Sequence, residues 1–189
     1  MPLVGGRFPA KNPQWLAAAQ PGGVYRESFD RRAINTDLAA LTTQIMSSVA
    51  ISLQAGDVVT SITFKSGATA AGTPTNWWFA LYDDSATPAL LAQSADQLTA
   101  AWAANTAKTL ALATAYTVLR PGIYYLGCMV KATTVPTLIG FTSFAGAVGG
   151  VLSTDKVLSV TSGSSLTTTA PATIATPTTV ATVPYAVVS

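Results

Sequence analysis

The chain has 189 residues, of which 49% are hydrophobic and only 10% are charged, and its formal net charge is +2. It contains no histidine, which excludes serine–histidine–aspartate and cysteine–histidine catalysis and the usual imidazole zinc sites. The mean hydropathy of +0.40 is high for a soluble monomer. The best membrane candidate, residues 140–152, is shorter than the roughly 20 apolar residues that a spanning helix needs. We therefore expect burial against protein, without membrane insertion.

Residues 1–23 contain four prolines and four glycines, so neither a regular helix nor a central strand suits them. We expect an extended N-terminal arm, and no signal peptide, because an apolar core is missing. The first 40 residues hold five basic and three acidic groups, which accounts for the whole net charge. These cations are too few and too widely spaced to indicate nucleic-acid binding by counterion release. The expected contact residues in and beside the arm are Arg7, Lys11, Trp15, Arg26, Arg31 and Arg32.

From residue 24 the pattern changes to short strand-like segments separated by Gly, Pro and Asp turns. The predicted strands cover 44–53, 58–64, 77–82, 90–93, 108–112, 116–119, 123–131 and 137–142. Alternation within the second of them predicts that Val58 shares a face with Ile62 and Phe64. This spacing predicts an all-β domain over residues 24–145, an antiparallel β-sandwich for which a jelly roll is the preferred topology.

Two segments depart from the strand pattern. Residues 94–107 are the most helix-like part of the chain, with Asp96 as the capping residue. The C-terminal segment, 146–189, is dominated by Thr, Ala, Ser and Val. Its low complexity is typical of a linker, but Thr and Val also suit strands. We expect it to be extended or β, and to pack on the sandwich or on the sheet edge of a neighbour.

Few side chains could support catalysis or metal binding. The single glutamate, Glu27, lies in or beside the arm, and the aspartates lie in predicted turns or helix caps, so a paired-carboxylate hydrolase is a weak alternative. Asp83 and Asp84 could offer oxygens to Ca²⁺, but an ordinary turn explains them better. The glycine-rich run 146–150 lacks the lysine and hydroxyl of a phosphate-binding loop. We expect no enzyme, no cofactor and no metal.

The lone cysteine, Cys128, excludes an internal disulfide and a thiolate metal cage, and its apolar surroundings predict a buried small hydrophobe.

The aromatic residues are the other candidates for contacts. Trp77 and Trp78 are consecutive, so a strand would point one indole inward and the other outward. The outward indole, together with Tyr82 or Trp102, could stack on a sugar ring. The alternative is that it lies beneath residues 94–107 or in a subunit interface, which the apolar composition favours.

Three strand motifs, LQAGDVVTSITF from Leu53, WWFALYDD from Trp77 and RPGIYYLGCMV from Arg120, surround a small-residue segment with a single tryptophan. In this arrangement residues 53–142 resemble a jelly-roll module of tailed-bacteriophage virion proteins. These are motifs of fold, not of catalysis. The resemblance implies a virion protein: a capsid decoration or minor capsid protein, with a tail, baseplate or fibre component as the alternative.

The same resemblance implies that the protein assembles as a homotrimer and contacts other virion proteins such as the major capsid protein. A receptor-binding module that binds a glycan is the alternative from a different class, and it requires an exposed Trp77 or Trp78.

Overall fold

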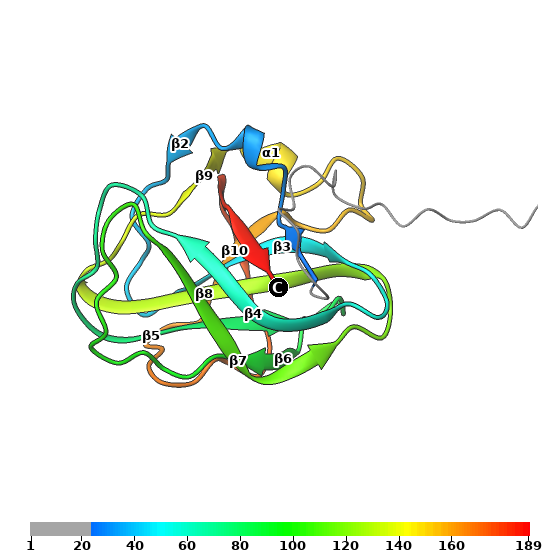
Figure 1. Cartoon of the computed structure of the whole chain (residues 1–189). Helices are drawn as coiled ribbons and strands as arrows, with labels where there is room; N and C mark the ends of the chain where they lie inside the picture. Colours follow the sequence, from blue (N-terminus) through cyan, green and yellow to red (C-terminus); the bar gives the residue numbers. More distant parts are fainter. Residues whose placement is uncertain (1–23) are drawn as a thin grey trace, which may run out of the picture.

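The computed structural model describes residues 24–189, which form an antiparallel β-sandwich with very little helix (Figure 1). The predicted fold class is therefore confirmed, while the jelly-roll topology stays a prediction. The expected N-terminal arm, with Arg7, Lys11 and Trp15, lies outside the described residues. Among residues 24–189 there is no helix whose length and apolar character would let it cross a membrane.

The strands belong to three sheets. In spatial order, the first sheet contains β1 (Arg26–Glu27), β13 (Ala186–Val188), β4 (Val58–Lys65) and β7 (Ala107–Thr117). The second contains β11 (Thr178–Thr179), β10 (Ser159–Ser162), β3 (Met46–Leu53), β8 (Gly122–Thr134), β5 (Gly72–Tyr82) and β6 (Leu90–Gln93). The third contains β12 (Thr182–Pro184), β9 (Ile139–Thr142) and β2 (Thr36–Asp37). The helical elements are a 3₁₀ turn, Arg31–Ala33, and α1 (Ala145–Val148).

The main core lies between the four-stranded and the six-stranded sheet. Strand β5 directs Trp77, Phe79 and Leu81 into it, because alternate residues of a strand point to the same face. The ring of Trp102, from the loop after β6, stacks on Trp77 with the ring centroids 5.1 Å apart. Phe64 of β4 approaches Phe79 from the opposite sheet, with a centroid distance of 4.9 Å.

The outer face of the six-stranded sheet carries a second core. The other residues of β5, among them Trp78 and Tyr82, point to this face and are buried there. Ala170 and Ile174 from the C-terminal segment pack over them, and Val160 of β10, in the same sheet, belongs to the same cluster. An antiparallel sheet commonly leaves one face to solvent, but here both faces of the larger sheet are covered by the same chain.

The C-terminal segment supplies strands to all three sheets. Strands β10 and β11 extend the six-stranded sheet, β12 pairs with β9, and β13 lies between β1 and β4. In Figure 1 the red strand β13 runs beside β4. Within the described chain this segment packs on its own sandwich, and packing on a neighbour stays a prediction.

Two local predictions are wrong. Residues 94–107 contain no helix. Asp96 instead accepts hydrogen bonds from the backbone N of Trp77 (2.9 Å) and of Leu98 (3.2 Å), and from the Asn76 amide (2.6 Å). These bonds fasten the segment to β5, and the burial of Trp102 in the main core holds it in a loop. Tertiary contacts thus override the local helix preference.

The second error concerns β4. Val58 is 42% exposed, whereas its neighbour Val59 is buried together with Ile62 and Phe64. The pairing between β4 and β7 changes register between Val59 and Ser61. Such an irregularity shifts the alternation of side chains along the strand, so the face predicted from strict alternation does not continue to Val58.

Candidate functional site

The aromatic residues predicted to contact a glycan or another subunit lie inside the single chain. Each of the four is at most 1% exposed: Trp77, Trp78, Tyr82 and Trp102. The Trp78 indole N–H donates to the carbonyl of Thr167 (2.7 Å), and the Tyr82 hydroxyl donates to that of Pro171 (2.9 Å). The prediction of surface contacts by these rings is therefore wrong. The physical reason is that the C-terminal segment covers the outer face of their sheet.

Residues 94–107 were expected to cover the indole on the outer face of the sheet, which is that of Trp78. They cover the indole of Trp77, on the inner face, instead. The Trp77 indole N–H donates to the carbonyl of Ala100 (2.9 Å), within residues 94–107. The prediction that one tryptophan points to each face of the sheet is correct, but the covering segments differ from those expected.

Two of the three described arginines proposed as arm contacts pair with aspartates of the same chain. Arg26 donates from Nε (3.0 Å) and Nη2 (2.8 Å) to the two carboxylate oxygens of Asp57, which ties β1 to the turn before β4. Arg32 pairs with Asp30, and its hydrogen bonds lower the pKa of that exposed carboxyl to about 2. The backbone N of Arg31 donates to Glu27 (3.1 Å). These contacts order the chain around β1 and the 3₁₀ turn.

Asp83 acts as a turn residue. Its Oδ1 accepts hydrogen bonds from the Ser85 backbone N (3.1 Å), the Ser85 hydroxyl (2.6 Å) and the Ala89 backbone N (2.8 Å). Partial burial would raise the Asp83 pKa, but these hydrogen bonds outweigh it, so the pKa is lowered. Asp84 faces Arg120 at 3.7 Å. Within residues 24–189, no three His, Cys, Asp or Glu side chains form a cluster that could hold a metal ion.

Cys128 is buried, as predicted for a small hydrophobe, and burial raises the pKa of its thiol.

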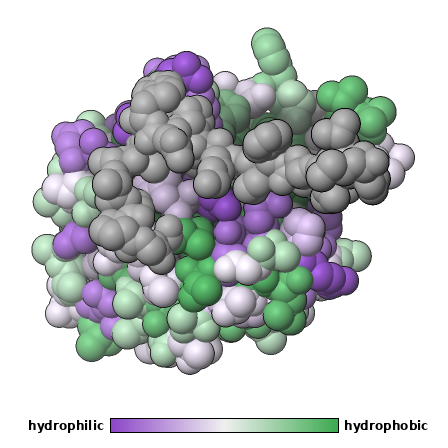
Figure 2. Space-filling model, turned by 45° about the vertical axis from the view of Figure 1, so that its right-hand side comes forward, coloured by the Kyte–Doolittle hydropathy of each residue, from purple (hydrophilic) through white to green (hydrophobic). Residues whose placement is uncertain are grey.

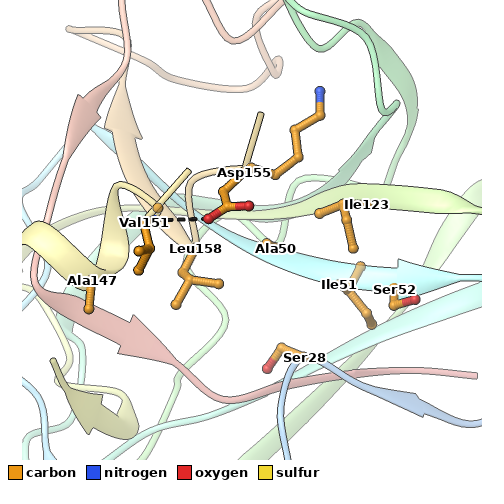
Figure 3. Close-up of a pocket in the computed structure, with 11 residues that line it drawn as sticks. Ser28, Ala50, Ile51, Ser52, Ile123, Ala147, Val151, Asp155 and Leu158 are labelled. Carbon is orange, nitrogen blue, oxygen red and sulfur yellow. Dashed lines mark hydrogen bonds between the residues drawn. The ribbon is translucent and has the colours of Figure 1, made fainter. Parts of the chain in front are cut away.

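An apolar pocket of about 370 Å³ lies at the surface beside β3 (Figure 3). One wall consists of residues 50–52 of β3 and Ile123 of β8. The other consists of Ala147 of α1 and of residues from the segment that follows it: Gly150, Val151, Asp155, Lys156 and Leu158. Ser28 closes one side. In Figure 3, Val151 and Leu158 face Ile123 and Ile51 across the hollow. Its size is at the lower end of the range found for ligand pockets, about 300–1,000 Å³.

Three of the polar side chains around this pocket already have hydrogen-bond partners in the chain. Asp155 Oδ2 accepts from the backbone N of Val151 (2.9 Å) and of Leu152 (2.8 Å). Lys156 Nζ donates to two backbone carbonyls, those of residues 84 (2.8 Å) and 85 (3.2 Å). The Ser28 hydroxyl accepts from the Ala186 backbone N (3.0 Å). Apart from the Ser52 hydroxyl, the side chains that complete the lining are apolar, which suits an apolar side chain better than a charged ligand.

Exposed apolar residues continue from the pocket along the segment 143–158, which we call the apolar loop. Four of the seven exposed large hydrophobics in the described chain lie there: Phe144 (89%), Val151 (87%), Leu152 (66%) and Leu158 (38%). In Figure 2, apolar residues reach the surface among polar ones over much of one face. Grouped exposed apolar side chains commonly mark interaction sites. The apolar stretch 140–152, considered above only for membrane insertion, is the sequence signal for this loop.

No known protein-family model matches the chain, and no curated protein matches it in sequence.

Proposed function

We propose that the chain is a non-enzymatic structural protein of a tailed-bacteriophage virion, a capsid decoration or minor capsid protein. It packs against copies of itself and against other virion proteins such as the major capsid protein. The observation that carries this proposal is the apolar loop, where Phe144, Val151 and Leu152 are each at least 66% exposed. The resemblance of residues 53–142 to a phage jelly-roll module supplies the virion context.

The size of the apolar loop indicates what kind of interface it would serve. Full burial of one large apolar side chain contributes about 1.5–3 kcal/mol, so Phe144, Val151 and Leu152 together contribute roughly 5–9 kcal/mol. Loss of translational and rotational freedom costs about 4–15 kcal/mol on association. The loop alone would therefore give a weak contact. We expect it to form the centre of a larger interface, of about 2,000 Å² or more if the assembly is obligate.

The chemistry of the pocket supports a role without catalysis. Its carboxylate, Asp155, and its amine, Lys156, are both engaged in hydrogen bonds to backbone groups. The other residues that line the pocket are apolar or glycine, apart from Ser28 and Ser52. Packing is thus the activity that these residues serve best.

Sedimentation equilibrium of the full chain tests the proposal. We expect an oligomer, a homotrimer by the resemblance, and we expect Phe144→Asp with Leu152→Asp to shift it toward monomer. The matched control is Leu98→Asp with Leu119→Asp, which changes two exposed leucines outside the loop (56% and 76% exposed). A wild-type chain that stays folded and monomeric up to about 100 μM would contradict self-assembly. Its association free energy would then be weaker than about −5.5 kcal/mol.

The location in the particle needs a separate measurement. Gold-labelled antibody against the chain should decorate the capsid of purified particles. Label confined to the tail would support the alternative, a tail, baseplate or fibre component.

A further inference from the structure

We infer that the apolar pocket receives the N-terminal segment of the same chain, with Trp15 and Leu16 as the side chains that enter it. Residues 1–23 lie outside the described part of the structure. The docking takes place within one chain, and it leaves Phe144 and Leu152, which do not line the pocket, available for the assembly proposed above.

The first argument is the chemistry of the pocket. Ile123, Val151 and Leu158 present carbon surface to a hollow of about 370 Å³. Asp155 is occupied with backbone N–H groups, so a ligand gains little from a polar group placed here. Two of the wall residues, Val151 and Leu158, are 87% and 38% exposed. An apolar side chain in the hollow would remove their surface from water.

The second argument is where the described chain begins. Its first residue, Val24, is four residues before Ser28, a wall residue of the pocket. Ser28 is held in place because its backbone N donates to the Ala186 carbonyl (2.9 Å). Trp15 is nine residues before Val24 and can therefore lie at most about 30 Å from it. This reach is ample in a domain whose radius of gyration is about 15 Å.

The third argument is the apolar composition of the N-terminal segment and its short covalent link to the domain. Residues 15–20, WLAAAQ, form an apolar run between Pro13 and Pro21. Prolines restrict the free chain and so reduce the entropy lost on docking. Tryptophan buries more apolar area than most side chains and dominates many interfaces. A short tether gives an effective concentration in the millimolar range. A neighbouring copy's Phe144 would have to compete with the tethered indole at that concentration.

Disulfide trapping in the full chain tests the docking. Ser52 is an exposed pocket residue of β3, so we pair Leu16→Cys with Ser52→Cys. The native Cys128 stays in place, because it is buried and its raised pKa keeps the thiol protonated. Under mild oxidation we expect a disulfide within one chain, seen as a monomer that has lost two hydrogens by mass spectrometry.

The matched control pairs Leu16→Cys with Leu98→Cys. Leu98 is 56% exposed and follows the residue whose backbone N donates to the Trp77 carbonyl. Trp77 pairs with Val130, seven residues along β8 from the pocket residue Ile123, or roughly 23 Å. We expect oxidation at residue 52 to be at least about tenfold faster, which corresponds to about 1.4 kcal/mol of docking. Equal rates at the two positions, or a covalent dimer in place of the internal bond, would overturn the inference.

Tryptophan fluorescence gives a second readout without cysteines. Trp15 is the one tryptophan of the four outside the described residues, and the other three are buried. Quenching by acrylamide therefore reports mainly on Trp15. We expect little quenching in the wild type and more in Ser52→Arg, which blocks the pocket, but not in Leu98→Arg. Equal quenching in all three folded proteins would overturn the docking.

Discussion

Replacement of Trp78 by alanine should cost the protein a large part of its folding stability. The indole is fully buried in the second core, against Met46 and the segment that carries Ala170 and Ile174. Truncation of a buried tryptophan to alanine costs about 3–5 kcal/mol through lost apolar contacts and a residual cavity. The lost hydrogen bond to the Thr167 carbonyl accounts for about 0.5–1.5 kcal/mol of this change. Total stability of a domain is about 5–15 kcal/mol, so the variant should lose about a fifth of it at least.

Urea unfolding followed by far-UV circular dichroism measures the effect. For a loss of about 4 kcal/mol and a slope of about 2 kcal/mol per molar urea, the midpoint should fall by about 2 M. Two controls bracket it. Tyr82→Phe removes only the hydrogen bond to Pro171 and should cost about 0.5–1.5 kcal/mol. Leu119→Ala, at a position that is 76% exposed, should change stability by less than about 0.5 kcal/mol.

A Trp78→Ala protein whose free energy of unfolding lies within about 1 kcal/mol of the wild-type value would refute the reasoning. Truncation of a side chain costs this little only where the side chain is not packed in a core. Binding to a glycan that disappears in this variant, without loss of stability, would refute it as well.

Three further outcomes follow from particular contacts. Gly140→Ala should destabilise the protein by about 3 kcal/mol or more in urea unfolding, because the added Cβ would lie 2.1 Å from the carbonyl oxygen of Val183 in the paired strand. Because Cys128 is buried, the native protein should not react with a thiol reagent such as dithionitrobenzoate, whereas one thiol per chain should react in urea. Rapid reaction of the native protein would contradict that burial. Burial raises the pKa of Tyr82 above 10.0, so its contribution to stability is complete below pH 10 and falls as the pH rises, by up to about 1.4 kcal/mol per unit. Urea unfolding at pH 8 and pH 11 should therefore show a smaller alkaline loss in Tyr82→Phe, and an equal loss would disprove the assignment.

The fold class follows from local features of the sequence. Alternating apolar residues and Gly, Pro or Asp turns mark most of the long strands, and β6 (Leu90–Gln93) lies where the sequence predicts it. Both signals arise from residues next to one another, since alternation and turn preference depend on backbone geometry over a few positions. The burial of Cys128 in the apolar run of β8 follows in the same way.

The predictions from sequence were wrong where contacts with residues distant in the chain determine the local structure. Asp96 is a good helix cap by residue type, but its carboxylate accepts hydrogen bonds from β5, about twenty positions earlier in the chain. Val58 continues the alternation of Ile62, but a change of register against β7 directs it to solvent. The pocket likewise depends on residues brought together from Ser28, β3, β8 and the apolar loop, which no local pattern connects.

Residues 77 and 78 show most clearly what the sequence determines by itself and what depends on the tertiary structure. Their adjacency in a strand determines that Trp77 and Trp78 point to opposite faces, because successive side chains of a strand alternate. Only the tertiary structure decided that the outer face is closed, by a segment whose carbonyl at Thr167 lies 89 residues from Trp78. The Thr-, Ala- and Val-rich composition of that segment suits a linker and a covering strand equally. The choice is made by the apolar area and hydrogen bonds that it gains on this sheet.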